Sequence, residues 1–222
     1  MTTHPRLVSW TRRLVASAAV SLVATSVPAG AETTDCAAHP PRLATLENPH
    51  VTDAAGDGAS PWAIVHGPAT DLIGAWITGP SAWESLSSQE PFRAVIRVAG
   101  MEGHPIHASY LWRYQTIEAE VLLIASASAS GAWSFSYNWN DGEGWATNPV
   151  SGAIDQEKGT ITMDIPPEGL PPRPADGSEL RFPLGEIQAR FFAGVPGGAG
   201  LMNTVDTAGE DCEITLYEAA PR

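Results

Sequence analysis

Basic residues are scarce in this chain, which contains a single lysine, Lys158. Lysine and arginine together number 12 against 25 aspartates and glutamates among 222 residues, so the formal net charge at pH 7 is −13. Nucleic-acid binding depends on neutralising phosphates with lysine and arginine. The shortage of positive charge therefore argues against nucleic acid as a partner. Apolar residues make up 43% of the chain and charged residues only 17%, which indicates a folded protein.

Cysteine is also scarce, since only Cys36 and Cys212 are present. One lies near each end of the chain, and an even pair placed this way is typical of a single disulfide in an oxidising compartment. We therefore expect a Cys36–Cys212 bridge. Two free thiols are the alternative.

Long apolar runs are missing beyond the N-terminus. Residues 1–31 resemble a secretory signal with a positive start, an apolar stretch and a small-residue cleavage site: Arg6, Arg12 and Arg13, then Leu14–Val27, then Ala29-Gly30-Ala31. The apolar stretch is shorter than the roughly 20 residues of a membrane-spanning helix, although a retained N-terminal anchor is the alternative. Removing residues 1–31 leaves nine basic residues against 25 acids. We expect an acidic, secreted protein with no membrane span after signal removal.

A helical period of 3.6 is absent from the rest of the chain, where apolar and polar residues alternate instead. Such alternation is typical of half-buried strands. The expected strands are 71–78, 92–98, 107–115, 118–127, 132–140, 160–165, 180–191 and 212–217. Gly, Pro, Asn and Ser separate them, which favours an all-β fold, a two-sheet antiparallel β-sandwich of about eight or nine strands. Residues 51–222 form this single domain, and residues 32–50 are expected to be an extended Pro-rich lead-in.

Four aromatic residues, Trp133, Phe135, Tyr137 and Trp139, alternate with small polar residues in one expected strand. A period of two places all four rings on one face. If that face is outward, the rings form a stacking platform for sugars, which Trp145 in the following turn extends. If it is inward, the rings are core. The expected ligand-binding residues are Trp133, Tyr137, Trp139 and Trp145, and both orientations of the stripe stay open.

Acidic residues surround a glycine turn at Asp53 and Asp57, and Asp71 opens the next expected strand. Carboxylate oxygens in loops are ligands that Ca²⁺ prefers outside cells. Asp53, Asp57 and Asp71 are therefore candidate calcium ligands. The alternative is that aspartate and glycine simply form a tight turn.

Sequence signatures of common enzymes are absent, including the Gly-x-Ser-x-Gly elbow, His-Glu-x-x-His and the phosphate-cradling glycine loop. No nucleotide cofactor is therefore expected. Glu118 with Glu120, or Asp141 with Glu143, are the acid pairs available for glycoside cleavage. Adjacent acids on one strand cannot flank a bond from two sides, so we predict no catalytic residues, with a secreted hydrolase of unknown class as an alternative.

The order of several segments resembles the DOMON and family-9 carbohydrate-binding-module class of β-sandwiches in exported bacterial and archaeal proteins. The segments are VTDAAGD (51–57), DLIGAW (71–76), YLWRY (110–114), WSFSY (133–137) and GTITMDIP (159–166). The resemblance implies a binding module, with sugar ligands and calcium in some relatives and haem in others. The spacing of Met101, Met163 and Met202 defines no haem site, so no haem is expected.

These observations together predict a secreted, non-catalytic binding module for a polysaccharide or cell-envelope component, stabilised by calcium at Asp53, Asp57 and Asp71. A structural or protein-binding envelope domain is a further alternative to the hydrolase.

Overall fold

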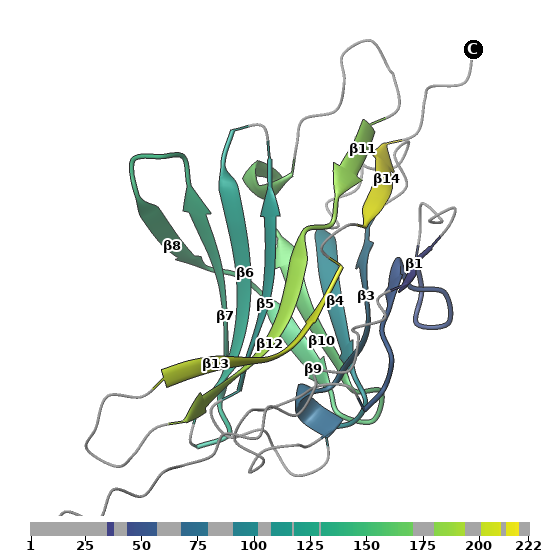
Figure 1. Ribbon diagram of the computed structural model, residues 1–222. Helices are drawn as coiled ribbons and strands as arrows, with labels where there is room; N and C mark the ends of the chain where they lie inside the picture. The colour runs from purple at the N-terminus through teal and green to yellow at the C-terminus, as the bar shows by residue number, and fades with distance from the viewer. Residues whose placement is uncertain are drawn as a thin grey trace, which may run out of the picture.

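The computed structural model describes ten segments of the chain (Figure 1): residues 35–37, 44–56, 68–79, 91–101, 108–116, 118–128, 130–170, 180–193, 201–209 and 212–217. Within them the chain forms fourteen strands and two short 3₁₀-helices, η1 and η2. The fold is all-β, as predicted from the alternation. The expected signal at 1–31 and residues 32–34 and 38–43 of the lead-in lie outside the described residues.

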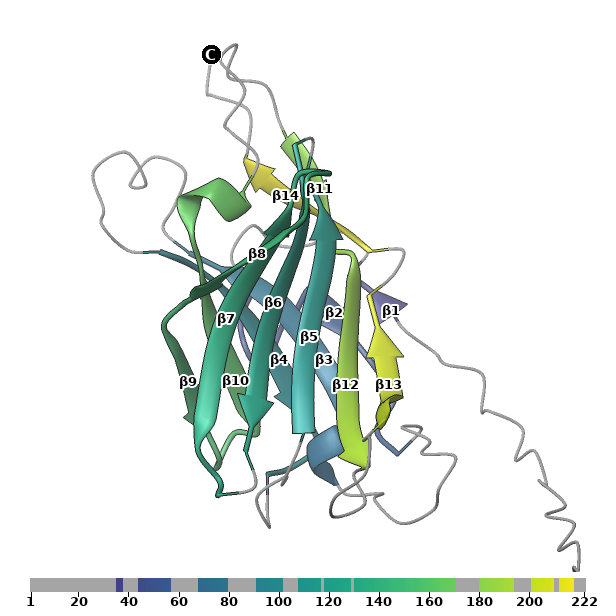
Figure 2. The same ribbon diagram turned by 90° about the vertical axis from the view of Figure 1, so that its left-hand side faces the viewer.

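Two antiparallel six-stranded sheets form a β-sandwich. The first sheet has the order β1 (Asp35–Cys36), β2 (Val51–Thr52), β3 (Leu72–Thr78), β4 (Phe92–Val98), β10 (Thr160–Ile165), β9 (Gly152–Asp155). The second has the order β13 (Leu201–Ala208), β12 (Glu186–Ala193), β5 (Ala108–Gln115), β6 (Glu120–Ala127), β7 (Trp133–Asn140), β8 (Trp145–Pro149). Figure 2 shows β7, β6, β5 and β12 in front of β10, β4 and β3.

The remaining elements are small. A two-stranded sheet pairs β11 (Leu180–Pro183) with β14 (Glu213–Tyr217), and the 3₁₀-helices are η1 (Pro68–Thr70) and η2 (Pro167–Gly169). The expected strand 180–191 is in fact two strands, β11 and β12, in different sheets. The chain turns between them at Gly185, whose φ of 72° favours glycine. A Cβ there would also collide with the Arg113 carbonyl oxygen.

The core between the sheets combines large rings with small residues. Tyr110, Trp112 and Tyr114 on β5 are almost fully buried, whereas the inner face of the neighbouring β6 carries Ala125 and Ala127. Because alanine leaves room above β6, rings from β5 and β7 fill that space. The buried polar atoms of the β5 rings bond to backbone carbonyls: Trp112 Nε1 donates to Leu184 O (2.6 Å), Tyr110 Oη to Ala69 O (2.5 Å) and Tyr114 Oη to Gly169 O (2.8 Å).

Residues 44–50 of the lead-in cover the outer face of the first sheet, and residues 35–36 form the edge strand β1. Thr45 and Asn48 close a turn through two backbone hydrogen bonds. Ala44 and Leu46 pack with Trp76 and Val95, which form a second small core. His50 is also buried, and its Nδ1 accepts the Ile77 N–H at 3.2 Å. These contacts hold the lead-in against β3 and β4.

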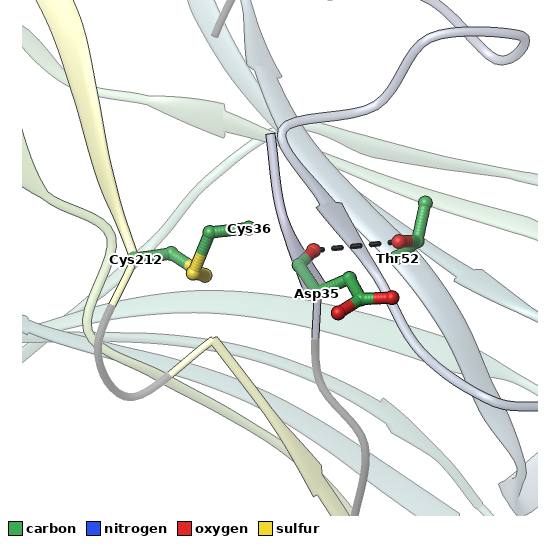
Figure 3. Close-up of a disulfide and its surroundings, with 4 residues drawn as sticks. All are labelled: Asp35, Cys36, Thr52 and Cys212. Carbon is green, nitrogen blue, oxygen red and sulfur yellow. Dashed lines mark hydrogen bonds between the residues drawn. A yellow bond between two sulfur atoms is a disulfide. The ribbon is translucent and has the colours of Figure 1, made fainter. Parts of the chain in front are cut away.

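The expected disulfide is present, because Cys36 in β1 and Cys212 just before β14 form the bridge shown in Figure 3. The two Cα atoms lie 5.4 Å apart across a sequence separation of 176 residues. Beside the bridge, Thr52 Oγ1 donates to the Asp35 carbonyl oxygen at 3.3 Å. The bridge thus fixes the start of the lead-in to the last described strand.

We predict that the Cys36→Ala, Cys212→Ala double variant loses up to about 5 kcal/mol of unfolding free energy, because a loop of this length is released in the unfolded chain. Urea unfolding measures the loss. Dithiothreitol should destabilise the wild type to the same level and leave the double variant unchanged. A loss within about 0.5 kcal/mol, typical of a neutral surface substitution, would contradict the prediction.

Candidate functional site

The aromatic stripe on β7 faces the core. Tyr137 is only 1% exposed, and Trp133, Phe135 and Trp139 are partly buried against the same core cluster. Trp133 stacks on Tyr110 of β5, with ring centroids 5.9 Å apart and an interplanar angle of 24°. Of the two orientations that the sequence leaves open, the inward one is found. A platform of all four rings on the outer surface therefore does not form.

Phe135 shows how closely the stripe packs on the opposite sheet. Its ring lies over Gly152 in β9, where even a Cβ atom would collide with it. A glycine in a strand often marks such a close approach. The strand Gly152–Asp155 was not expected from the sequence, because four residues with little apolar patterning give no strand signal.

The outer face of the second sheet is polar. Residues paired across antiparallel strands share a face, and the register gives four rows on the side opposite the aromatic stripe. These rows are Arg190, Ser109, Ser126 and Ser134; Gln188, Leu111, Ile124, Ser136 and Pro149; Glu186, Arg113, Leu122, Asn138 and Thr147; and Gln115, Glu120, Asn140 and Trp145. We call these residues the outer polar face. Three aliphatic side chains, Leu111, Leu122 and Ile124, lie in its middle.

Charges on the outer polar face have partners within it. Arg113 Nε forms an ion pair with Glu120 Oε1. On β12, Gln188 links two charged residues. Its amide nitrogen donates to Glu186 Oε1, and its Oε1 accepts from Arg190 Nε at 2.5 Å. The face is therefore close to neutral, although the chain as a whole is strongly acidic.

Trp145 stands at the end of this face, on the edge strand β8 at the left of Figure 1. It is 51% exposed, the most exposed large hydrophobic side chain among the described residues. Its cross-strand partner is Asn140. The turn before it is fixed by local bonds from Gly142 N to Asn140 Oδ1 (2.9 Å) and from Glu143 N to Asp141 Oδ1 (3.0 Å). An open indole beside amide groups can stack on an apolar ring face and hydrogen-bond its substituents.

The end of the sandwich near η2 holds a second group of polar atoms. Tyr114 Oη bonds to Gly169 O, whereas Tyr137 Oη is buried without a hydrogen-bond partner among the described residues. Burial raises the pKa of Tyr114 well above its usual range. Burial, and then the negative charge of Glu168, raise the pKa of Tyr137 to about 12. Both phenols therefore keep their protons at neutral pH.

Asp53 and Asp71 lie close together at the start of β3, and we call this pair the acidic corner. Asp71 Oδ2 accepts the Gly56 N–H at 2.8 Å, and Asp53 Oδ1 accepts the Ala54 N–H at 3.1 Å. The second oxygen of each carboxylate is buried. The structure thus brings Asp53 and Asp71 to the same turn, while Asp57 lies outside the described residues. Across the part of the chain that is described, no group of three or more His, Cys, Asp or Glu side chains is placed to hold a metal ion.

Asp206 is a buried acid that the sequence reasoning missed. It is 4% exposed and its carboxylate accepts the N–H groups of Leu72 (2.6 Å) and Thr207 (2.9 Å). It thereby joins β13 to the start of β3. No sequence signal marks it, because its role depends on a contact across 134 residues.

The acid pairs considered for glycoside cleavage lie at the surface. Glu120 is engaged with Arg113, and Glu118, Asp141 and Glu143 are exposed. Glu118 follows Thr116, whose hydroxyl accepts its N–H at 3.3 Å.

No protein-family model, curated protein or solved structure matches this chain. The resemblance to DOMON and family-9 carbohydrate-binding modules therefore stays a prediction. What is shown is the class of fold, a two-sheet antiparallel β-sandwich closed by a disulfide. None of the described segments contains a helix long and apolar enough to cross a membrane.

We predict that two aromatic substitutions differ strongly in their effect on stability. Phe135→Ala should lower the unfolding free energy by about 2 to 4 kcal/mol, because it leaves a cavity against Gly152. Trp145→Ala should change it by no more than about 0.5 kcal/mol, because the indole is exposed. Urea unfolding of both variants checks this. A Phe135→Ala protein as stable as Trp145→Ala would show that the stripe is not core.

Proposed function

We propose that this protein is a secreted, non-catalytic binding module for an extracellular glycan, either a polysaccharide or a cell-envelope component, and that it binds through the outer polar face. The single observation that carries the proposal is the exposed Trp145 at the end of a face rich in amide and hydroxyl groups. Sugar recognition needs this combination, because a sugar ring has an apolar face and a rim of hydroxyls.

The contrast between the two outer faces supports the choice of surface. The lead-in covers Trp76 and Val95 on the first sheet, so the apolar part of that face is occupied by the chain itself. On the second sheet, Leu122 and Ile124 remain half-exposed between polar residues. Since the face is nearly neutral by its internal pairs, a neutral glycan meets no strong repulsion there.

Secretion is part of the proposal. The expected signal at residues 1–31 supports it, and so does the disulfide, because such bridges persist in oxidising compartments. A long acidic chain with one lysine would remain soluble in the extracellular space through its own charge repulsion.

Calcium at the acidic corner is also proposed. Asp53 and Asp71 converge on one turn with buried carboxylate oxygens, which is the hard oxygen donor set that Ca²⁺ takes. Two carboxylates are fewer than the six to eight oxygens usual for Ca²⁺. Asp57, backbone carbonyls and water would complete the set.

We predict that Trp145→Ala weakens binding to a glycan at least about tenfold, because an exposed ring that anchors a ligand dominates the binding energy. A panel of cellohexaose, xylohexaose and chitohexaose in calorimetry, with insoluble polysaccharide pull-downs, measures it. The control is Thr162→Ala on the outer face of the first sheet, which should bind as the wild type does. Binding to none of these glycans, or binding unaffected by Trp145→Ala, would contradict the proposed function.

Added Ca²⁺ should raise the melting temperature and a chelator should lower it, because the ion binds only the folded chain. Asp57→Asn should lose the response. Asp155→Asn, at the exposed ion pair with Lys158 (2.9 Å), should keep it. A melting curve that is identical in Ca²⁺ and in chelator would remove calcium from the account.

A further inference from the structure

Strand β8 is an open edge of the second sheet, as Figure 1 shows at its left-hand side. All five residues of the strand, Trp145–Pro149, are exposed. The strand pairs with β7 on one side, and within the described part of the chain no strand pairs with its other side. An edge of this kind presents unpaired N–H and C=O groups to which a further strand can add.

The pairing of β7 with β8 fixes which backbone groups of β8 are already used. Just beyond β8, Val150 N donates to Phe135 O at 3.2 Å. Hydrogen-bonded and non-hydrogen-bonded pairs alternate along antiparallel strands. Because the register from Val150 back through β8 has no shift, Ala146 and Asn148 are the residues whose N–H and C=O groups face β7.

The alternate residues of β8 direct their backbone groups to the open side. These are Trp145 and Thr147, each with an N–H and a C=O group, and Pro149, which has a carbonyl alone. Proline is tolerated at an edge where its missing N–H would face solvent, so Pro149 agrees with this assignment. The open edge is therefore short, and Pro149 marks the end of its donors.

The turn that leads into β8 carries two carboxylates. Asp141 and Glu143 are both exposed, and Asp141 Oδ1 accepts the Glu143 N–H at 3.0 Å. Neither carboxylate takes part in an ion pair within the described part of the chain. A cation on an incoming strand would therefore meet negative charge at this end of the edge, with no internal cation to displace.

We propose that β8 binds an extended peptide segment of a partner protein, which adds to the second sheet as an antiparallel strand and carries arginine or lysine at its C-terminal end. Antiparallel pairing is the more stable arrangement per residue. Because β8 runs away from the turn at 141–144, an antiparallel strand runs toward it, and its last residues lie beside Asp141 and Glu143. The proposal goes beyond the proposed glycan site, since it uses backbone groups rather than the Trp145 indole.

A second copy of this chain fits the edge less well. Pairing of β8 with itself about a two-fold axis at Thr147 places Trp145 opposite the Pro149 of the other copy. The missing N–H of proline then leaves the Trp145 carbonyl without a donor. Each copy also carries a formal net charge of −13, so the two chains repel each other.

The test compares two capped peptides of the same composition and charge, VTVTVRR and RRVTVTV, in titrations followed by ¹H–¹⁵N correlation spectra. VTVTVRR should bind more tightly by about 2- to 5-fold, the range for exposed ion pairs, and should slow hydrogen exchange at the Trp145 and Thr147 amides. The double variant Asp141→Asn, Glu143→Gln should bind both peptides equally, because it removes the charge and keeps the side-chain oxygens.

Thr147→Pro should weaken binding of VTVTVRR at least about tenfold, because it removes an outward N–H and places a ring where the incoming carbonyl would lie. Thr147→Ala keeps the N–H and is the matched control, which should bind within about twofold of the wild type. Without peptide, Thr147→Pro should lower the melting temperature less than Ala146→Pro, whose lost N–H faces β7.

Three results would overturn the proposal. They are equal binding of the two peptides by the wild type, undiminished binding by Thr147→Pro, and a wild-type dimer in sedimentation that Thr147→Pro dissociates. The last result would show that a second copy occupies the edge. Tighter binding of VTVTVRR that Thr147→Pro abolishes and Thr147→Ala retains would support the proposal.

Discussion

The packing of rings across the small residues of β6 is the constraint on which the rest of the structure depends. Ala125 and Ala127 leave a space that Tyr110 and Trp133 fill by stacking, and Gly152 on the opposite sheet admits Phe135. Because side chains alternate strictly along a strand, placing these rings inside places Ser134, Ser136, Asn138 and Asn140 outside. The polar character of the outer face is therefore a direct consequence of the core.

The two outer faces of the sandwich differ because the lead-in covers only one of them. Residues 44–50 bury Trp76 and Val95, and the Cys36–Cys212 bridge holds the chain ahead of that segment. On the second sheet, Leu111, Asn138 and Gln188 are buried, Leu122 and Ile124 stay half-exposed, and the face ends at the exposed strand β8. Its partial apolar character and internal charge pairs are the reasons for which we propose it as the glycan-binding surface.

Much of the fold could be predicted from local pattern. The strand Phe92–Val98 follows its alternation, the expected strands 118–127 and 132–140 pair as β6 and β7, and Cys36 pairs with Cys212. The orientation of the aromatic stripe could not be predicted from the sequence, because a period of two fixes which residues share a face but not which face is buried. The short strands Trp145–Pro149 and Gly152–Asp155 are held by pairing with β7 and β10, so their own residues give no signal. The burial of the Tyr137 ring likewise could not be predicted, because Gly169 of η2, which packs against it, is brought near only by the tertiary structure.

The central claim, that ligand is bound at the β7–β8 edge of the second sheet, is tested most directly by ¹H–¹⁵N correlation spectra during titration with the hexasaccharide that binds best. The account predicts that the Trp145 indole signal and the amides of β7 and β8 shift together, while those of β3, β4 and residues 44–50 stay fixed. Shifts confined to the first sheet and its lead-in, with an unmoved Trp145 indole, would contradict it.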